Sequence, residues 1–436
     1  MSDASLAARA AALDLLRDVL RKSIPFDDAF DAHPDLRGLE PRDRGFVRML
    51  VATVLRRLGQ IDELIQGSLS KPGLPKATVH DVLRLGTAQL VFLGTPAHAA
   101  VDTAVELAAA RGAEPYKGLI NAVLRRIGRE GADLAARQDA GRLNTPDWLW
   151  LAWRQAYGMG RTRGIVEAHL HEAPLDITVK RDPAVWAERL EATLLPTGTL
   201  RRPPGGSITE LPGFAEGAWW VQDLAASLPA KLFGDLSGKL VYDLCAAPGG
   251  KTAQLVAQGA AVVAVDRSAK RLERVRDNLA RLDLPAEILA ADAATWTPDQ
   301  PADAVLLDAP CSATGAIRRH PDILRVKTPD DIAKLARAQN RLLAHAVDLV
   351  KPGGLLIYCT CSIQPEEGEA QVDRILARDG RVERVPIEPG ELGGPNGDHL
   401  GQLINERGEI RSLPGMLADR GGIDGFFVAR LRRLRA

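Results

Sequence analysis

The feature that most constrains the fold is a strand–turn–helix pattern that repeats from residue 238 onward. Short apolar runs end in polar residues at LVYDL (240–244), AVVAVD (261–266), EILAAD (287–292), ADAVLLD (302–308) and GGLLIYCT (353–360). Helical stretches follow the second run and fill roughly 329–350, and GFFVARLRRL (425–434) is a last strand-like segment. Strands that alternate with helices predict a doubly wound, largely parallel α/β sheet of the Rossmann-like kind.

The region before this pattern has a different character. Residues 1–130 carry apolar residues at helical spacing, as in Leu13, Leu16 and Leu20, with breaks at Pro- and Gly-containing turns. Residues 145–235 mix a strand-like segment, 174–180, with a helical stretch and turns. We therefore expect an all-α domain at 1–135, a small α/β module at 145–235 and the α/β domain at 236–436.

Composition narrows the functional classes. The chain has 436 residues, of which 46% are hydrophobic. Its formal net charge is zero, so the overall charge does not indicate nucleic-acid binding. Its four cysteines contain no C-x-x-C pair and do not make a disulfide framework, and we expect no metal site. The N-terminal residues lack a signal pattern and no apolar run is long enough to span a membrane, which predicts a cytoplasmic protein without membrane contact.

Polar residues gather where the predicted strands end, and ligands bind at those ends in such sheets. The loop CAAPGGKT (245–252) resembles phosphate-binding motifs but lacks the glycine spacing of either a P-loop or a dinucleotide fingerprint. Asp266 follows about 20 residues after the loop, where an acid bonds ribose hydroxyls, and Asp292 could accept from an adenine amino group. A nucleoside without phosphates and with a small charged tail near Asp243 fits S-adenosylmethionine.

Two cysteines are expected to face the same pocket, because Cys311 and Cys361 follow neighbouring strands. Any one cysteine is more often a small buried apolar residue. A thiolate beside a methyl donor, however, indicates methylation of C5 of a pyrimidine, since addition of sulfur to C6 makes C5 nucleophilic. Asp308 could then bond the ring and stabilise the adduct.

These segments, together with RRHPDI (318–323), YCTCSIQPEEGE (358–369) and the terminal DGFFVARL, resemble the Sun/RsmB-type RNA cytosine-5 methyltransferases. The first 130 or so residues resemble the NusB-type helical RNA-binding fold, and the resemblance implies that the domain at 1–135 and the module at 145–235 bind RNA. The resemblance implies an S-adenosylmethionine-dependent RNA (cytosine-5-)-methyltransferase that acts on 16S rRNA. Its target would be an unpaired or flipped cytosine, and we expect a monomer.

The resemblance also implies roles for individual residues. Cys361 is the expected nucleophile, Cys311 acts in product release, and Asp308 contacts the base. The residues expected to bind the cofactor are Cys245, Ala246, Ala247, Pro248, Gly249, Gly250, Lys251, Asp266, Asp292 and Asp308.

The chain departs from the family pattern at three places. Cys359 stands where the family has Ser or Ala, Gly368 replaces the Asn of PEENE, and Leu324-Arg325 replaces Lys-Trp. Three other functions stay open from the residues alone: a DNA cytosine-5 methyltransferase with Cys311 as nucleophile, a non-catalytic RNA-binding transcription or ribosome-assembly factor, and a small-molecule methyltransferase.

Overall fold

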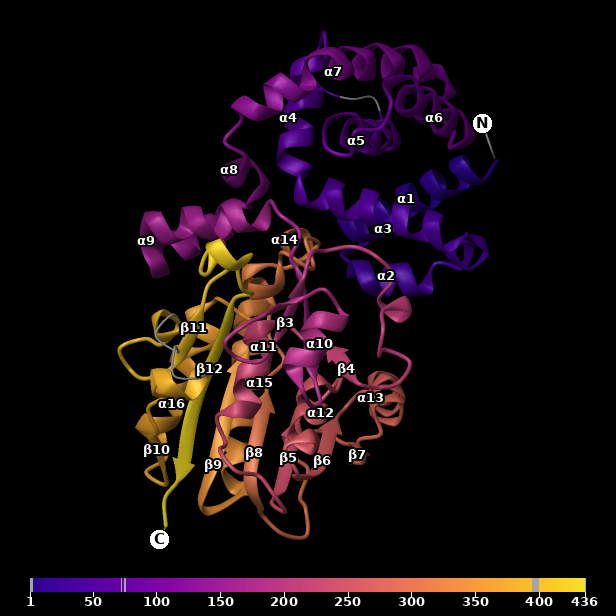
Figure 1. The fold of residues 1–436 in the computed structure, drawn as a ribbon. Helices are drawn as coiled ribbons and strands as arrows, with labels where there is room; N and C mark the ends of the chain where they lie inside the picture. Colours follow the sequence, from indigo (N-terminus) through magenta and orange to yellow (C-terminus); the bar gives the residue numbers. More distant parts are fainter. Residues whose placement is uncertain (1–2, 72, 74–75, 394–399, 436) are drawn as a thin grey trace. The chain divides into compact units, whose positions relative to one another are not determined.

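The computed structural model describes residues 3–71, 73, 76–393 and 400–435 (Figure 1). Contacts between residues divide the chain into two units. The helical unit comprises 1–171 with 317–327, and the sheet unit comprises 172–316 with 328–436.

The helical unit confirms the prediction of an all-α N-terminal region. Its helices are α1 (Asp3–Lys22), α2 (Phe26–Ala32), α3 (Pro41–Arg56), α4 (Leu58–Ser68), α5 (Ala77–Val91), α6 (Ala97–Ala110), α7 (Lys117–Arg137), α8 (Ala140–Asn144), α9 (Asp147–His169) and α14 (Ile323–Val326). The residues predicted from helical spacing form the core, and Leu13, Leu16 and Val54 are fully buried. Burial of such side chains stabilises each by about 1.5–3 kcal/mol.

Helical structure continues past residue 135. Helix α9 runs to His169 and bends at Gly158, whose φ of 76° lies in the left-handed region that favours glycine. The division into functional domains at 1–135, 145–235 and 236–436 stays a prediction.

A segment from the second half of the chain packs within the helical unit. The Phe26 amide donates to Asp322 Oδ2 at 3.0 Å, and the Arg56 guanidinium donates to the Arg318 carbonyl at 2.9 Å. Arg325, one of the family departures, donates to the Asn144 carbonyl at 2.8 Å. Arg56 and Arg325 therefore hold the backbone of this unit together.

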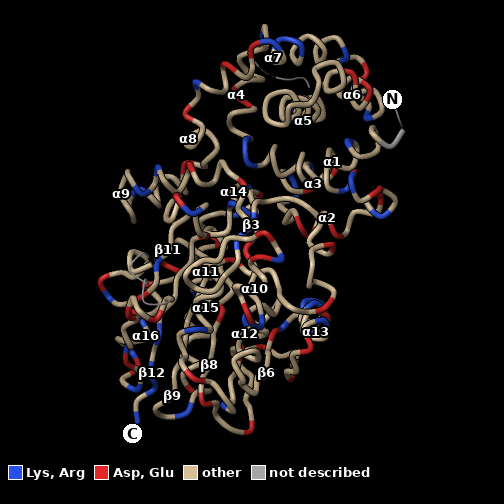
Figure 2. Tube along the Cα trace, in the orientation of Figure 1, with Lys and Arg blue, Asp and Glu red and all other residues tan. Residues whose placement is uncertain are grey.

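Figure 2 shows basic and acidic positions interspersed along the helices of this unit. Several arginines of α3 and α7 have partners, since Arg48 pairs with Asp27 and Arg126 pairs with Glu130. Arg42 and Arg44 are exposed on α3. The helices of this unit thus carry both paired and exposed arginines.

The main sheet of the sheet unit confirms the predicted α/β class. Its strands are β5 (Leu240–Leu244), β6 (Ala261–Asp266), β7 (Glu287–Ala290), β8 (Ala302–Asp308), β9 (Val350–Thr360), β10 (Val382–Arg384), β11 (Ile410–Ser412) and β12 (Phe426–Arg433). The order is β10-β12-β9-β8-β5-β6-β7, and β11 also pairs with β12. The five strands from β9 to β7 are parallel, so their carboxyl ends share one edge.

Alternate residues along the central strands enter two different cores, as expected for a sheet covered on both faces. Leu306 and Cys359 pack in one core with residues of α11 (Leu224–Lys231) and α12 (Gly250–Ala257). Leu307 and Tyr358 pack in the other with residues of α15 (Pro329–Leu349) and α16 (Glu369–Arg378). Helix α13 (Ala269–Leu282) forms a further apolar cluster.

A second, antiparallel sheet precedes the main one in sequence. It comprises β1 (Leu175–Val179), β2 (Thr193–Leu194), β3 (Leu200–Arg202) and β4 (Trp219–Val221) in the order β2-β3-β1-β4, with α10 (Pro183–Arg189) beside it in the chain. Asp176 and Arg201 form a bidentate ion pair, with both nitrogen–oxygen distances 2.7 Å. Both side chains are buried, and Arg201 also donates to two backbone carbonyls.

We predict that Asp176→Ala destabilises the sheet unit by about 3–5 kcal/mol, because it leaves the Arg201 charge buried without its partner. Urea unfolding of the full chain, followed by tryptophan fluorescence, measures the loss. The matched control is Glu383→Ala, which breaks an exposed pair with Arg432 and should cost less than about 1 kcal/mol. Equal losses in the two variants would contradict the prediction.

Candidate active site

The loop that follows β5 is built for close backbone approach. Gly249 has a φ of 98° and caps the N-terminus of α12. A Cβ at this position would also come within 3.1 Å of the Val275 side chain, so glycine is required for two reasons. The Ala247 amide donates to Asp266 Oδ2 at 3.2 Å, which joins the predicted cofactor loop to the end of β6.

Asp243 is a buried acid at the end of β5. Its Oδ2 accepts a 2.5 Å hydrogen bond from the Thr252 hydroxyl, while its Oδ1 has no partner among the described residues. Burial raises the pKa of Asp243 to about 7, and nearby Asp308 adds to the shift. An unpaired acceptor beside the glycine loop suits the cationic amino group of the S-adenosylmethionine expected from the sequence.

Asp308 lies between Lys251, which is predicted to bind the cofactor, and Cys359, which departs from the family pattern. Lys251 Nζ is 2.7 Å from Asp308 Oδ2, and Cys359 Sγ is 3.6 Å from Asp308 Oδ1. Burial alone would lower the pKa of Lys251, but the adjacent Asp308 carboxylate outweighs it and the pKa is raised. The lysine predicted to bind cofactor thus orients the acid predicted to contact the base.

The structure brings the two expected catalytic cysteines into contact. Cys311 Sγ and Cys361 Sγ are 3.4 Å apart, and the backbones of their loops meet where the Gly315 amide donates to the Cys361 carbonyl at 3.0 Å. The hydrogen bond to Cys361 raises the pKa of Cys311 well above its usual value, and burial raises it further. Cys311 is therefore held in its protonated form, with its sulfur in contact with the sulfur of Cys361.

The other two cysteines have different surroundings. Cys359 is fully buried in the core with Leu306, and burial raises its pKa well above the usual value. Cys245 has a positive φ of 62°, and burial raises its pKa to about 12. Both thiols are held protonated, whereas Cys361, the expected nucleophile, is partly exposed and in contact with Cys311.

Asp292 has a local role in this structure. Its Oδ1 accepts from the Ala294 amide at 2.9 Å in the turn after β7, and its side chain is exposed. The β7 and β6 ends are nevertheless adjacent, because the Ala291 amide donates to the Asp266 carbonyl. Asp292 thus lies at the edge of the sheet where the parallel strands end, beside Asp266, which is predicted to bind ribose.

Sequence reasoning missed a buried polar cluster behind the cysteines. The Glu367 cluster comprises Glu367, Ser312, Ser362 and Gln339. A signal was present, because each expected catalytic cysteine is followed directly by a serine, at 312 and 362.

Gly368, a departure from the family pattern, has a steric consequence. A Cβ here would lie 2.3 Å from the Arg411 guanidinium and 2.9 Å from the Phe427 ring. Without that Cβ, Arg411 stacks on Phe427 and donates to the Ser362 carbonyl at 2.6 Å. The glycine therefore admits an arginine that supports the loop carrying Cys361.

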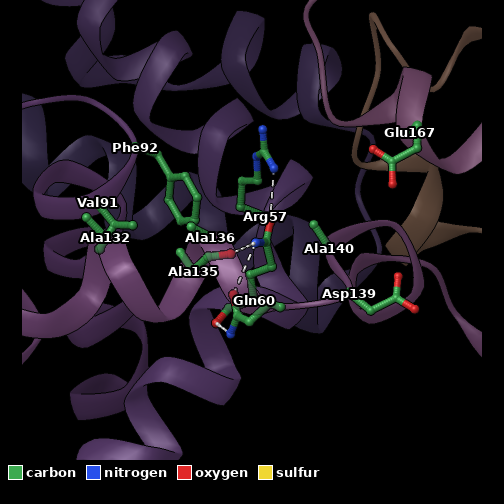
Figure 3. Close-up of a pocket in the computed structure, with 11 residues that line it drawn as sticks. Arg57, Gln60, Val91, Phe92, Ala132, Ala135, Ala136, Asp139, Ala140 and Glu167 are labelled. Carbon is green, nitrogen blue, oxygen red and sulfur yellow. Dashed lines mark hydrogen bonds between the residues drawn. The ribbon is translucent and has the colours of Figure 1, made fainter.

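A separate hollow of about 480 Å³ lies within the helical unit (Figure 3). Arg57 stacks over Phe92 on its wall and donates to Gln60 and to the Leu170 carbonyl. None of the site residues predicted from sequence lines it. Within the part of the chain that the structure describes, no helix is long and apolar enough to cross a membrane.

Comparison with known proteins gives a consistent picture. The family model described as 16S rRNA methyltransferase RsmB/F matches residues 235–432, and the NusB family model matches residues 6–129. The ribosomal RNA small subunit methyltransferase B of Vibrio cholerae is 38% identical over 405 residues, which are 88% of this chain and 92% of that protein.

Solved structures show the same fold. The crystal structure of PH0851 matches 99% of this chain and 99% of its own, at 24% identity and a TM-score of 0.72. NSun6 from Pyrococcus horikoshii, crystallised with SFG, matches 67% of this chain and 99% of its own, at 19% identity and a TM-score of 0.56.

We predict that Asp243 makes the protein less stable as the pH rises from about 4 to about 7. The folded-state pKa is about 7 against an ordinary value of 3.8 for an aspartate, so the folded state holds the proton more tightly across that window. The contribution is fully present below pH 4 and lost above pH 7, and amounts to at most about 4 kcal/mol. Asp243→Asn should remove it.

Urea unfolding at pH 5 and pH 8 measures this change. The difference in unfolding free energy between the variant and the parent should favour the variant more at pH 8. Asp283→Asn, at an exposed position, is the matched control. It should change the unfolding free energy equally at both pH values. A pH-independent difference for Asp243→Asn would refute the assignment.

Proposed function

The chain belongs to the 16S rRNA methyltransferase RsmB/F family, as its motifs predicted, and we propose that it methylates C5 of a cytosine in 16S rRNA through a covalent cysteine–C6 adduct. S-adenosylmethionine is the methyl donor in this proposal. The observation that carries it is the 3.4 Å contact between Cys311 and Cys361, at the same sheet edge as the Asp308–Lys251 pair.

The geometry supports a defined division of labour. The Cys361 thiolate forms a bond to C6 of the ring, and the electron pair displaced from the C5–C6 double bond makes C5 nucleophilic. Bound S-adenosylmethionine supplies an electrophilic methyl group, which C5 takes. A general base then removes the C5 proton, the electron pair of that C–H bond restores the C5–C6 double bond, and the C6–sulfur bond breaks to free the Cys361 thiolate.

Asp308 and Cys311 assist at opposite ends of this sequence. In this proposal Asp308, held by Lys251, accepts a hydrogen bond from the ring N3–H or amino group and so stabilises the adduct. Cys311 touches the Cys361 sulfur and can exchange a proton with it as the thiolate leaves C6. These roles agree with the ones that the family resemblance implies.

The RNA partner follows from the family, and the state of its base is part of the proposal. C6 of a stacked, paired cytosine is out of reach of a thiol within a protein loop, so the target must be unpaired or flipped out of its helix. We also propose that the protein acts as a monomer.

Two rival functions predict different chemistry. A DNA-type enzyme would use Cys311 as nucleophile, and the Cys361 thiol in contact with it would then have no role. A non-catalytic RNA-binding factor would have no need for the contact between two thiols or for the partly buried Lys251–Asp308 pair.

We predict that Cys361→Ala abolishes methyl transfer to unmodified 16S RNA and forms no covalent RNA adduct. Cys311→Ala should instead accumulate the adduct, because the step that frees Cys361 is impaired. Labelled S-adenosylmethionine measures transfer, and a denaturing gel detects the adduct.

The matched control is Cys359→Ala, which removes the buried neighbouring thiol and should still transfer methyl groups. Transfer by Cys361→Ala but not by Cys311→Ala would favour the DNA-type assignment. An inactive parent protein on every RNA tested would favour the non-catalytic reading.

We further predict that the helical unit adds RNA affinity through phosphate contacts. Arg42→Ala/Arg44→Ala should weaken binding and reduce the slope of log K against log salt by about 1.4, which corresponds to two lost single-strand contacts. Fluorescence anisotropy with labelled RNA, titrated from about 50 to about 200 mM salt, measures the slope.

Two exposed arginines of the sheet unit provide the control for this test. Arg378 is the last residue of α16. Arg432 of β12 is paired in register with Leu355 of β9, at the end of that strand away from the cysteines. Arg378→Ala/Arg432→Ala should leave the slope unchanged. Salt-independent binding by the parent protein would contradict the phosphate model.

A further inference from the structure

We propose that Glu367 is a positioning residue that holds the loops of Cys311 and Cys361 at catalytic distance, an inference that rests on the function proposed above. The side chain touches neither cysteine sulfur in the contacts described. It acts through the residue that follows each cysteine.

The contacts of Glu367 span both loops. Its Oε2 accepts from the Ser312 hydroxyl at 2.5 Å and from the Ser362 hydroxyl at 2.6 Å. Its Oε1 accepts from the Ser312 amide at 2.9 Å and from the Gln339 side chain at 3.0 Å. One carboxylate therefore binds the residues next to both sulfur-bearing positions, which are 50 residues apart in the chain.

Glu367 is itself fixed from several sides. Its carbonyl accepts from the Tyr358 hydroxyl at 2.7 Å, on the strand that leads to Cys361. Gln339 of α15 binds the Glu367 carboxylate and also donates to the Pro310 carbonyl at 2.9 Å, directly before Cys311. A carboxylate with a fixed backbone and four donors is a rigid connection.

The burial of Glu367 indicates that the residue positions the two loops and does not act as an acid or a base on the substrate. The side chain is 0% exposed and all its donors come from the protein. Substrate therefore has no access to it, and its effect must pass through the geometry of the two loops. Misplacement of a reacting group by about 1 Å can cost about 100-fold in rate.

The test compares Glu367→Ala with Glu367→Gln in single-turnover methyl transfer. The alanine variant should lose about 100-fold in rate while its apparent affinity for S-adenosylmethionine changes less than about 3-fold. The glutamine variant should stay within about 5-fold of the parent, because its oxygen can face the Ser312 amide while both serine hydroxyls accept from its amide.

Exposed Glu366, the neighbour in sequence, gives the matched control, and Glu366→Ala should keep the parent rate. A folded Glu367→Ala protein at the parent rate would overturn the proposal. So would a glutamine variant as slow as the alanine variant, since that would make the charge and not the hydrogen bonds essential.

A second variant covers the case in which Glu367→Ala does not fold. Ser312→Ala/Ser362→Ala removes both hydroxyl contacts to Oε2 and keeps the Ser312 amide and Gln339 contacts to Oε1. We expect a loss of about 10-fold in rate, smaller than for the complete removal of the carboxylate. Parent-like rates in this folded variant would also overturn the proposal.

A readout without RNA separates this inference from the proposed function. Diamide, an azo oxidant, takes two protons and two electrons from a pair of thiols and becomes the hydrazine, while the sulfurs form a disulfide. Peptide mass mapping measures the rate at which Cys311 and Cys361 become joined.

Contact at 3.4 Å should make this coupling fast in the parent and in Glu366→Ala. It should be about 10-fold slower in Glu367→Ala, because separated loops lower the effective concentration of one thiol at the other. An unchanged coupling rate would overturn the positioning role. Slower coupling in Glu367→Ala, together with a parent protein that methylates no RNA, would instead leave the positioning role standing and remove the proposed function.

Discussion

The parallel pairing of β8 with β9 is the constraint on which the candidate site depends. Asp308 pairs with Cys359 in the register of these strands, and one residue later the Ala309 amide donates to the Cys359 carbonyl. The chains beyond this point run side by side, which carries Cys311 and Cys361 to within 3.4 Å of each other. A slip by one residue would turn the side chains of β9 to the other face and separate Asp308 from its neighbours.

Periodicity in the sequence predicted the sheet because buried parallel strands are short apolar runs between helices. The bounds of β6 and β8 agree with AVVAVD and ADAVLLD to the residue, and α15 spans 329–349 against the expected 329–350. The convergence at the strand ends also followed from parallel topology, and four of its parts are now linked by contacts: Ala247 to Asp266, and Lys251 to Asp308.

The sequence did not predict which polar groups, far apart in the chain, bind one another. Glu367 reads as one acid in PEEGE, and nothing local indicates that it binds Ser312, which lies 55 residues away. Arg56 likewise reads as one more arginine on a helix face, yet it binds the carbonyl of Arg318. Patterns report which face of an element is buried, whereas these contacts depend on how separate segments meet in three dimensions.

The charges at the strand ends give a physical reason why a cationic donor suits this edge of the sheet. Burial raises the pKa of Asp243, and the nearby Asp308 and Asp266 add to the shift. Those two neighbours each have a cationic partner, because Lys251 pairs with Asp308 and Arg271 pairs with Asp266. Oδ1 of Asp243 has no hydrogen-bond partner among the described residues. An ammonium group beside Asp243 would favour the ionised form of its carboxyl group, so binding of a cationic donor there would be coupled to loss of the proton that burial retains.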